Sequence, residues 1–448
     1  MTAIICIFIT GYLLIAMESL TKVNKSAVAL LMAVICWTLF YLGFGDTPEH
    51  VSAFTKALGE TSEILFFLMG AMVIVETVDT NGGFSFVREK LISASKVSLL
   101  WKLTLMTFFL SAVLDNMTTA IVMVMILDKL ISERKDKMLY ASMVILAANS
   151  GGAFSPIGDV TTIMLWVKGN VSTFGIIRSL FLPSLVSVLV PALIMSFMLK
   201  GRLETIQLPS DDPNNRLSIS SREKTAVFAV GVGGLLFVPV FRFLTGLPPF
   251  MGILLVLALI WMLTEMIFKQ SKYQDIPHDR LPDVSALLHK IDLSTILFFL
   301  GILTTVAALS ETGALKMLGT SLDKAFDGNP YFTTSIIGIL SAVVDNVPLV
   351  ASCMGMYDVA VFPEAVNGLQ QVNVYGVDGT FWELLAYCAG IGGSLLIIGS
   401  AAGVVVMGLE KVSFGWYLKE VSLIALLGYL AGALTFIIQD TYIVPLFN

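Results

Sequence analysis

The sequence is poor in charge: only 13% of its 448 residues are Asp, Glu, Lys or Arg, whereas 56% are hydrophobic. Soluble globular domains carry about 25% charged residues, so a soluble protein of this composition could not cover its surface. The apolar residues gather in runs of roughly 20, which is the length of a membrane-crossing helix. The composition therefore predicts an α-helical membrane protein. A net charge of −6 argues against a nucleic-acid partner.

Histidine and cysteine are also scarce. The three histidines lie in segments that we interpret as polar loops, so carboxylates must carry any proton chemistry inside the membrane. The four cysteines show neither metal-ligand nor redox spacing. No glycine-rich nucleotide motif ending in Lys-Ser or Lys-Thr occurs. We therefore predict neither a cofactor nor an enzymatic activity.

The apolar runs predict about ten membrane spans and two segments of a different kind. The first run, 2–19, lacks the basic start and the cleavage site of a signal peptide, so we interpret it as a span. The predicted spans are 2–19, 26–44, 64–80, 138–167, 180–199, 225–241, 249–268, 293–311, 381–409 and 421–438.

The two remaining segments, 103–127 and 332–356, are predicted re-entrant hairpins. Basic loops flank 103–127 on both sides, and Lys and Arg mark cytoplasmic loops. A single crossing cannot have both ends inside, so this segment must enter and return, with its tip near 114–118. The loop 357–380, which has acidic residues but neither Lys nor Arg, reads as external. The second hairpin thus enters from the opposite face, and both termini lie outside a bacterial inner membrane.

The two halves of the chain share sequence in the same order. Ser111-Ala-Val-Leu-Asp-Asn116 recurs as Ser341-Ala-Val-Val-Asp-Asn346, and a Gly-Gly pair with a further glycine six residues on occurs at 151–158 and 392–399. The repeats start on opposite faces, so they are inverted, which is typical of transporters. We predict scaffold helices in 1–62, repeat one in 63–200, a cytoplasmic linker in 201–224, further scaffold helices and a cytoplasmic loop in 225–292, and repeat two in 293–448.

The tip of the first hairpin contains Asp115, Asn116 and Thr118 between two apolar stretches. An ionisable residue at such depth is costly and is a functional candidate by default. The alternative is an Asp that only caps the second helix of the hairpin. Both roles are compatible, and the recurrence of Asp-Asn at Asp345-Asn346 favours a functional one.

A second group of polar residues interrupts the span 138–167. Two glycines, a proline and a third glycine cannot continue a helix. Unwound backbone inside a membrane is tolerated where it lines a cavity or is buried in protein. The side-chain oxygens here come from Asn149, Ser150, Ser155, Asp159, Thr161 and Thr162. Such hard oxygen ligands suit a hard cation.

The equivalent break in repeat two, 390–403, is poorer in oxygen ligands. Aligning the repeats replaces Asn149 by Gly390 and Asp159 by Ser400. Only Ser394 and Ser400 offer side-chain oxygens there, beside Asp345 and Asn346 of the second hairpin. The main cation site should therefore belong to repeat one, with Asp345 as a proton carrier or second ligand.

The charge of these motifs predicts the charge of the substrate. They contain three carboxylates, from Asp115, Asp159 and Asp345, and neither Lys nor Arg. Burial and mutual repulsion raise the pKa of carboxylates, so that such a group can hold either a proton or a metal ion. This competition is sufficient for cation/proton exchange. We predict Na⁺ ligation by Asp115, Asn116, Asn149, Asp159 and Thr161.

Further acidic residues lie near the ends of spans. Asp79 and Glu311 correspond between the repeats, and Glu76 lies one turn before Asp79. They are either solvated charges at helix ends or residues with a role in access or pH sensing.

The motifs at 111–119, 149–162 and 341–346 resemble those of NhaD-type sodium/proton antiporters, and the resemblance covers nearly the whole chain. It implies exchange of Na⁺ or Li⁺ for H⁺, activity at alkaline pH, and a homodimer in which a transport domain slides against a scaffold domain like an elevator. It also implies ligand roles for Asp115, Asn116, Asn149, Asp159, Thr161, Thr162, Asp345 and Asn346.

Two alternatives remain open. Sodium-coupled dicarboxylate symporters of the same superfamily carry Ser-Asn-Thr at both hairpin tips, where this chain has Asp-Asn. A cation channel or a receptor would belong to a different class, and a flux assay without an opposing proton gradient separates a channel from an exchanger.

Overall fold

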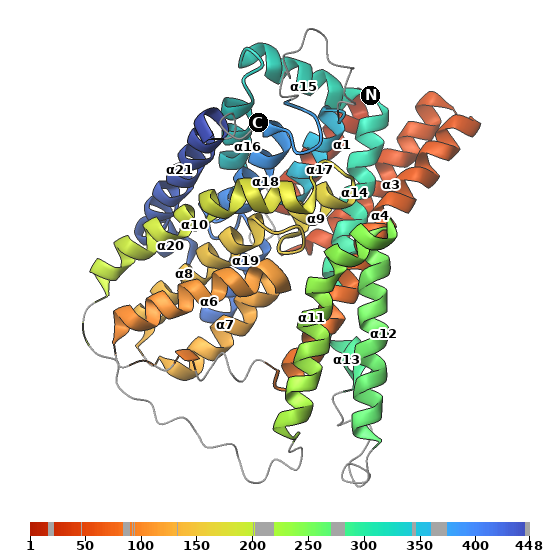
Figure 1. The fold of residues 1–448 in the computed structure, drawn as a ribbon. Helices are drawn as coiled ribbons and strands as arrows, with labels where there is room; N and C mark the ends of the chain where they lie inside the picture. Colours follow the sequence, from red (N-terminus) through yellow and green to blue (C-terminus); the bar gives the residue numbers. More distant parts are fainter. Residues whose placement is uncertain are drawn as a thin grey trace.

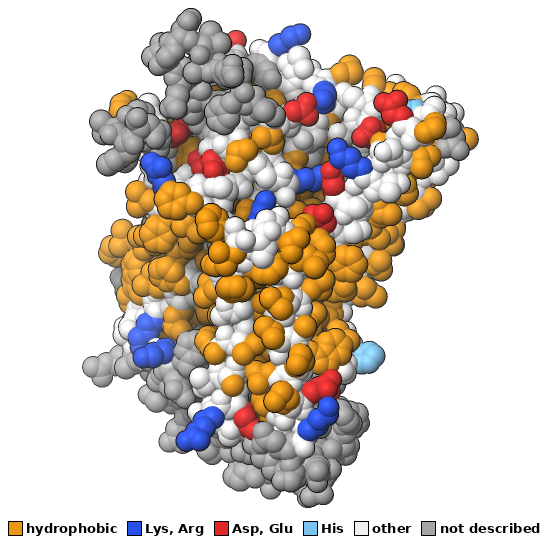
Figure 2. Space-filling model, turned by 45° about the vertical axis from the view of Figure 1, so that its right-hand side comes forward, with side chains coloured by type: hydrophobic (Ala, Val, Ile, Leu, Met, Phe, Trp, Pro, Cys, Tyr) orange, Lys and Arg blue, Asp and Glu red, His pale blue; other side chains and the backbone are white. Residues whose placement is uncertain are grey.

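A computed structural model describes residues 1–16, 22–45, 47–83, 90–91, 93, 95–131, 133–199, 201, 219–269, 283–342, 346–359 and 374–443. Every regular element in these ranges is a helix (Figure 1). Eight of the described helices are long and apolar enough to cross a membrane. Hydrophobic side chains form a broad band around the middle of the molecule, and charged side chains gather toward its two ends (Figure 2). The prediction of an all-α polytopic membrane protein is confirmed.

One group of helices, on the right of Figure 1, forms a bundle that we call the scaffold bundle. Its α3 and α14 lie so close that a Cβ added at Gly301 of α14 would be 2.5 Å from the backbone carbon of Ala29. Small residues allow such close packing of membrane helices. The bundle consists of α1 (Thr2–Ala16), α3 (Lys25–Phe44), α4 (Pro48–Thr80), α11 (Ser221–Thr245), α12 (Pro249–Phe268) and α14 (Leu293–Glu311), with the short α13 (Val284–Leu287) and η3 (Leu288–Lys290) beside it.

Helix α4 corrects the sequence interpretation of its first half. The apolar run predicts a span from 64, with 45–62 and its His50 in a loop, but the helix begins at Pro48 and has 33 residues. Thr47 caps it by accepting a hydrogen bond from the main chain of His50 at 3.3 Å, and proline is favoured at the first helical position. The charged residues of 49–63 hide this extension from a hydropathy pattern, although Glu and Lys are good helix formers.

Most of the remaining helices form a second group, the hairpin body, which extends from the centre to the left of Figure 1. From repeat one it contains α6 (Lys96–Leu114), α7 (Asn116–Leu130), α8 (Arg134–Ala153), α9 (Val160–Val167) and α10 (Thr173–Met198). From repeat two it contains α16 (Pro330–Leu340), α17 (Asn346–Met356), α18 (Thr380–Gly392), α19 (Ala401–Glu410), α20 (Phe414–Glu420) and α21 (Ser422–Ile438), which continues into the π-helix η4 (Gln439–Ile443).

Helices α6 and α7 form the predicted re-entrant hairpin. Lys96, at the start of α6, places its Nζ 3.0 Å from Oε2 of Glu133, which follows α7 and is 37 residues away. A continuous helix of that length would separate them by about 55 Å. The chain reverses at Asp115, whose φ of +77° is rare for a residue other than glycine. The segment thus enters and leaves at one end of the molecule.

The second predicted hairpin contains α16 and α17. Lys316 Nζ lies 2.8 Å from Asp358 Oδ2, so the chain that leaves α17 passes beside the segment that precedes α16. Lys316 belongs to α15 (Ala314–Ala325), a helix that the apolar pattern did not predict. Residues 343–345, and with them Asp345, lie outside the described residues.

The two repeats share backbone contacts as well as sequence. Ser111 donates to the carbonyl oxygen of Ala148 at 2.5 Å, and the equivalent Ser341 donates to that of Ala389 at 2.7 Å. A Cβ at Gly151 would lie 2.1 Å from the Phe108 carbonyl oxygen, and one at Gly392 would lie 2.0 Å from the Gly338 oxygen. Each hairpin therefore packs against its broken helix in the same way, and the prediction of two inverted repeats is confirmed.

Candidate cation site

The break in repeat one lies between α8, which ends at Ala153, and α9, which begins at Val160. Asp159 caps α9: its Oδ1 accepts hydrogen bonds from the main-chain N–H and the hydroxyl of Thr161, both at 2.9 Å. Asp is a preferred N-cap because its carboxylate satisfies main-chain N–H groups of the first turn. The break thus fixes one carboxylate at a helix N-terminus inside the hairpin body.

The hairpin tip meets this carboxylate through Asn116. The side-chain amide nitrogen of Asn116 donates to Oδ2 of Asp159 at 2.6 Å and to Oδ1 of Asn149 at 3.0 Å. Asn149 lies on α8, one turn before its end. Three residues from three helices are thereby held together, as the sequence predicted for members of one site.

Asn149 joins the site to repeat two. Its amide nitrogen donates to the hydroxyl oxygens of Ser394 at 2.7 Å and Ser400 at 2.9 Å. Ser400 caps α19 by accepting from the Gly403 N–H at 3.1 Å, the role that Asp159 has in α9. Gly390 occupies the place equivalent to Asn149, and a Cβ there would lie 3.7 Å from Asp159 Oδ2. The two breaks therefore face each other across the repeat interface.

The network is buried. Asn149 and Thr161 are 0% exposed, and Asp159 is 1% exposed. Asn116, Ser394 and Ser400 are buried as well. The hydrogen bonds that Asn116 and Thr161 give to Asp159 come from neutral groups. A carboxylate this deeply buried is able to hold either a proton or a metal cation.

Asp115 lies beside this network. It caps α7, and its carboxylate accepts from the main-chain N–H of Thr118 at 2.8 Å and from the Thr118 hydroxyl at 2.6 Å. Together with Asn116 it lines a small cavity of about 50 Å³ that also borders Phe67 of α4 and Phe299 of α14. Asp115 therefore faces the boundary between the hairpin body and the scaffold bundle.

Three more of the predicted residues bond the surrounding backbone and side chains. Ser155 donates to the Ala112 carbonyl at 2.5 Å, and Thr162 donates to the carbonyl oxygen of Asp159 at 2.8 Å. Ser150 accepts from Ser187 of α10 at 2.9 Å. These bonds hold the break in place. Asn346 is buried at the start of α17.

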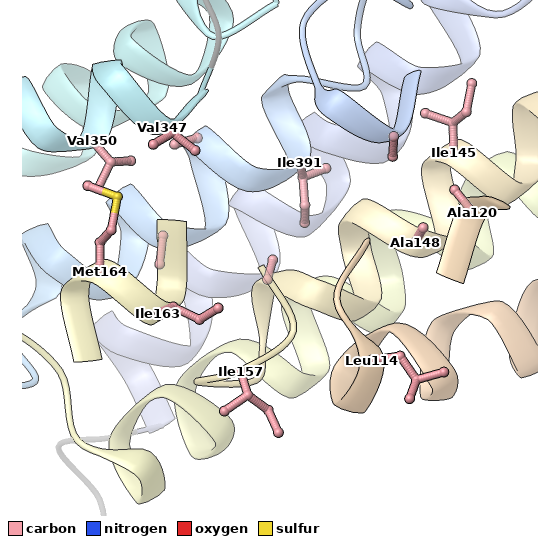
Figure 3. Close-up of a cluster of buried hydrophobic side chains, with 14 of the residues drawn as sticks. Leu114, Ala120, Ile145, Ala148, Ile157, Ile163, Met164, Val347, Val350 and Ile391 are labelled. Atoms are coloured by element: carbon pink, nitrogen blue, oxygen red, sulfur yellow. The ribbon is translucent and has the colours of Figure 1, made fainter. Parts of the chain in front are cut away.

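Apolar side chains surround the site and border a wide cavity. Met164 of α9 and Val350 of α17 point toward one another in Figure 3, where Ile163, Val347 and Ile391 also belong to the cluster. Met164 also lines a cavity of about 770 Å³ between α4, α14, α15 and α17. The cavity thus reaches the hairpin body at the apolar side of α9.

Of the acidic residues at helix ends, Glu311 lines this cavity. Glu76 accepts from the Thr80 hydroxyl at 3.0 Å, and the main-chain oxygen of Asp79 accepts from the Gly82 N–H at the end of α4. Asp79 therefore lies in the last turn of α4, and Glu311 is the last residue of α14, beside the cavity. A role of these residues in access or pH sensing stays a prediction.

Arg242 was not predicted to be near the site. It lies in the last turn of α11 and donates from Nη1 to the main-chain oxygen of Trp166, in α9, at 2.6 Å. The only sequence signal is a basic residue directly after the apolar run 225–241, which reads equally well as an interfacial cation.

The comparisons with known proteins agree with this geometry. A sequence model of the citrate-transporter family (CitMHS) matches residues 12–376. Sodium/proton antiporter 2 of Arabidopsis thaliana is 44% identical over 96% of this chain and 98% of its own length. The Na⁺/H⁺ antiporter NhaD of Vibrio cholerae is 30% identical over 96% of this chain and 90% of its own. The chain belongs to the NhaD-type antiporter family.

A solved structure supports the fold of this NhaD-type chain. The YdaH transporter of Alcanivorax borkumensis, whose crystal structure has an unusual topology, matches 94% of this chain and 99% of its own with a TM-score of 0.58. Sequence identity is 10%, so the match concerns the fold alone. The family match and the apolar helices together make the protein a multi-pass membrane transporter.

Proposed function

We propose that the protein exchanges Na⁺, or Li⁺, for H⁺ across the membrane. The observation that carries this proposal is the Asp159 carboxylate, which is 1% exposed and belongs to a hydrogen-bonded network that joins side chains of both repeats. The network members Asn149, Thr161 and Ser400 are neutral and carry side-chain oxygens of the kind that suits a small hard cation. Relatives named Na⁺/H⁺ antiporters, at 30% to 44% identity, support the same substrates.

Proton and cation would compete for the same carboxylate. When Na⁺ binds, it offsets the charge of Asp159, and Asn116 holds the second carboxylate oxygen in place. When Na⁺ leaves, a proton restores neutrality, because a bare carboxylate is costly in this buried site. Each cargo thus excludes the other, which is the requirement for antiport.

We further propose that exchange is electrogenic. The hairpin tips and the break contribute three carboxylates, from Asp115, Asp159 and Asp345. One Na⁺ offsets a single charge, whereas repulsion between bared carboxylates favours loading of two protons. With more than one H⁺ per Na⁺, each net charge moved at about 100 mV contributes ~2.3 kcal/mol. This would drive Na⁺ outward against an alkaline exterior.

The proposed transport motion is an elevator-like sliding of the hairpin body against the scaffold bundle, in a homodimer with both termini outside a bacterial inner membrane. Glu60 of α4 and Lys168, directly after α9, form an ion pair between the two groups. In a variant without native cysteines, a short bifunctional reagent joining Cys at 60 and 168 should stop exchange. A second pair, Ser26→Cys with Ser294→Cys, whose hydroxyls lie 2.9 Å apart within the scaffold bundle, should leave exchange intact when joined.

A second candidate function is sodium-coupled uptake of a di- or tricarboxylate, because the matching family is described as a citrate transporter. The Asp-Asn sequence at both hairpin tips counts against it, since a carboxylate there would repel an anionic substrate.

The deciding experiment measures dissipation of a pH gradient in everted vesicles after addition of Na⁺, Li⁺, K⁺, succinate or citrate. We expect Na⁺ and Li⁺ to dissipate the gradient without any carboxylate present. A response that required succinate or citrate would support the symporter instead. In proteoliposomes, a Na⁺ flux indifferent to an imposed membrane potential would refute the electrogenic stoichiometry.

A further inference from the structure

Helix α9 carries the site carboxylate at one end and contacts the scaffold bundle at the other. It has 8 residues and is therefore about 12 Å long. Asp159 caps its first turn, and Trp166 lies in its last turn. Because a helix this short moves as a rigid rod, any displacement of its outer end is passed on to Asp159 and Thr161.

Arg242 of α11 makes two contacts with that outer end. Its Nη1 donates to the Trp166 carbonyl oxygen at 2.6 Å, and its guanidinium carbon lies 4.8 Å from the centroid of the Trp166 ring. Trp166 is 1% exposed, and its ring also packs edge to face with Phe67 of α4, with 6.5 Å between the ring centroids. A guanidinium can stack on an aromatic ring and donate a hydrogen bond at once, whereas an ammonium has no planar face for stacking.

The position of Arg242 suits the electrostatics of α9. A helix C-terminus carries partial negative charge on its last carbonyl groups, and a cation there is stabilising. The Trp166 oxygen also accepts from main-chain N–H groups of Lys168 and Gly169, and Arg242 adds a charged donor. Lys168, immediately beyond the helix, pairs with Glu60 of α4. Both ties run from the scaffold bundle to the end of α9 remote from the site.

We propose that Arg242 is a positioning residue for the cation site: in the conformation described here it anchors α9 to α11 and thereby sets the place of the Asp159 carboxylate and the Thr161 hydroxyl, and the contact opens when the hairpin body slides. It rests on the proposed cation exchange, because Asp159 is taken as the ligand. Arg242 acts through α9 and touches neither the cation nor the carboxylate.

The test is the kinetics of Arg242→Ala in proteoliposomes. The apparent Na⁺ constant should rise about 10- to 100-fold, as for loss of a hydrogen bond to a charged group. The maximal rate at saturating Na⁺ should stay within a factor of about 3, because the ligands themselves remain. Arg242→Lys keeps a donor but loses the stacking, so its apparent Na⁺ constant should lie between those of the unaltered protein and Arg242→Ala.

The matched control is Lys316→Ala. It removes a cation that lines the 770 Å³ cavity and pairs with Asp358 rather than with a group of α9, and its Na⁺ constant should equal that of the unaltered protein. An unchanged constant in Arg242→Ala, or a loss of rate alone, would overturn the proposal. If Arg242→Ala does not fold, Arg242→Lys decides, and an unchanged constant there overturns it equally. Absence of Na⁺ exchange in the unaltered protein would instead refute the proposed function.

Discussion

The two breaks of this molecule have the same backbone design and different side chains. In each, a serine of the hairpin bonds a carbonyl of the broken helix, and a polar residue caps the following short helix. The cap is Asp159 in repeat one and Ser400 in repeat two, and Asn149 has Gly390 as its counterpart. The shared geometry is therefore built by glycine and serine, whereas only the break of repeat one has a charged cap.

This difference indicates a division of labour between the repeats. Ser394 and Ser400 both accept hydrogen bonds from Asn149, so the break of repeat two orients an amide of repeat one. Gly390 leaves space beside Asp159, where a side chain would be 3.7 Å from Oδ2. Repeat two thus supports and shapes a site whose carboxylate belongs to repeat one.

The largest expected effect is the difference in exchange activity between variants of the two cap residues. Asp159→Asn should abolish Na⁺-dependent dissipation of a pH gradient, because the amide keeps the size of the side chain but cannot bind a proton or offset Na⁺. Ser400→Ala should retain exchange, since it removes a neutral hydroxyl that caps α19 and supports Asn149, and leaves the Asp159 carboxylate in place. Both variants should reach the membrane at the level of the unaltered protein, measured by immunoblotting. Normal exchange by Asp159→Asn would remove this carboxylate from the mechanism.

The second prediction concerns what the breaks share. Gly151→Ala and Gly392→Ala should both lower the yield of folded protein severely, because each new Cβ would lie within about 2.1 Å of a carbonyl oxygen and close-packed interiors tolerate no such overlap. Size-exclusion chromatography in detergent measures the folded fraction. Gly408→Ala in α19, where a Cβ meets nothing within 4 Å, is the control. A mild effect at only one of the two glycines would contradict their equivalence.

The sequence predicted the parts of this design that depend on composition and order. Basic loops on both sides of 103–127 predicted a hairpin, and the contact of Lys96 with Glu133 confirms it. The repeated glycines predicted equivalent breaks, and their close approach to carbonyl groups explains why no larger residue fits. Both features follow from local pattern, so a single sequence is sufficient.

Features that depend on tertiary packing were less accessible. The first half of α4 is charged, so a hydropathy pattern does not predict that it is helical. Helix α15 is too polar for the same pattern to predict it. The pairing of Asn149 with Ser394 and Ser400 needs the two breaks to face each other, which no local pattern encodes. Arg242 meets Trp166 for the same reason. The membership of Asp345 in the site stays a prediction, because that residue lies outside the described ranges.

A smaller effect is expected when the support that repeat two gives to Asn149 is weakened. Ser394→Ala removes one of the two acceptors of the Asn149 amide. Loss of a buried hydrogen-bond partner costs ~1–2 kcal/mol, so the apparent Na⁺ constant should rise about 5- to 30-fold with little change in maximal rate. Ser352→Ala is the control, since that hydroxyl bonds the Pro348 carbonyl of its own helix at 2.8 Å. A Ser394→Ala constant equal to the control's would show that Asn149 needs no support from repeat two.

The smallest expected effect compares two ion pairs, one beside the first hairpin and one beside the end of α17. Lys96 has a side chain 16% exposed and pairs with Glu133 and Asp136, whereas the pair Lys316 and Asp358 is 60% and 81% exposed. The hydrogen bond and charge of Lys96 lower the pKa of Glu133 below its usual value. A lowered folded-state pKa means that the ionised carboxylate stabilises the fold above its unfolded pKa, and that this contribution disappears as the pH falls through the folded value.

Glu133→Gln should therefore lower the thermal midpoint at pH 7 by about 1 °C, since an exposed pair contributes little. The difference should shrink as the pH falls below the usual pKa of glutamate and vanish below the lowered pKa of Glu133. Asp358→Asn should show no shift at either pH, because its partner is itself exposed and salt-screened. Tryptophan fluorescence of the protein in detergent, followed on heating at both pH values, measures these midpoints. A difference for Glu133→Gln that grew at low pH would reverse the sign expected from Lys96, and Asp136 alone would then be the partner that holds Lys96.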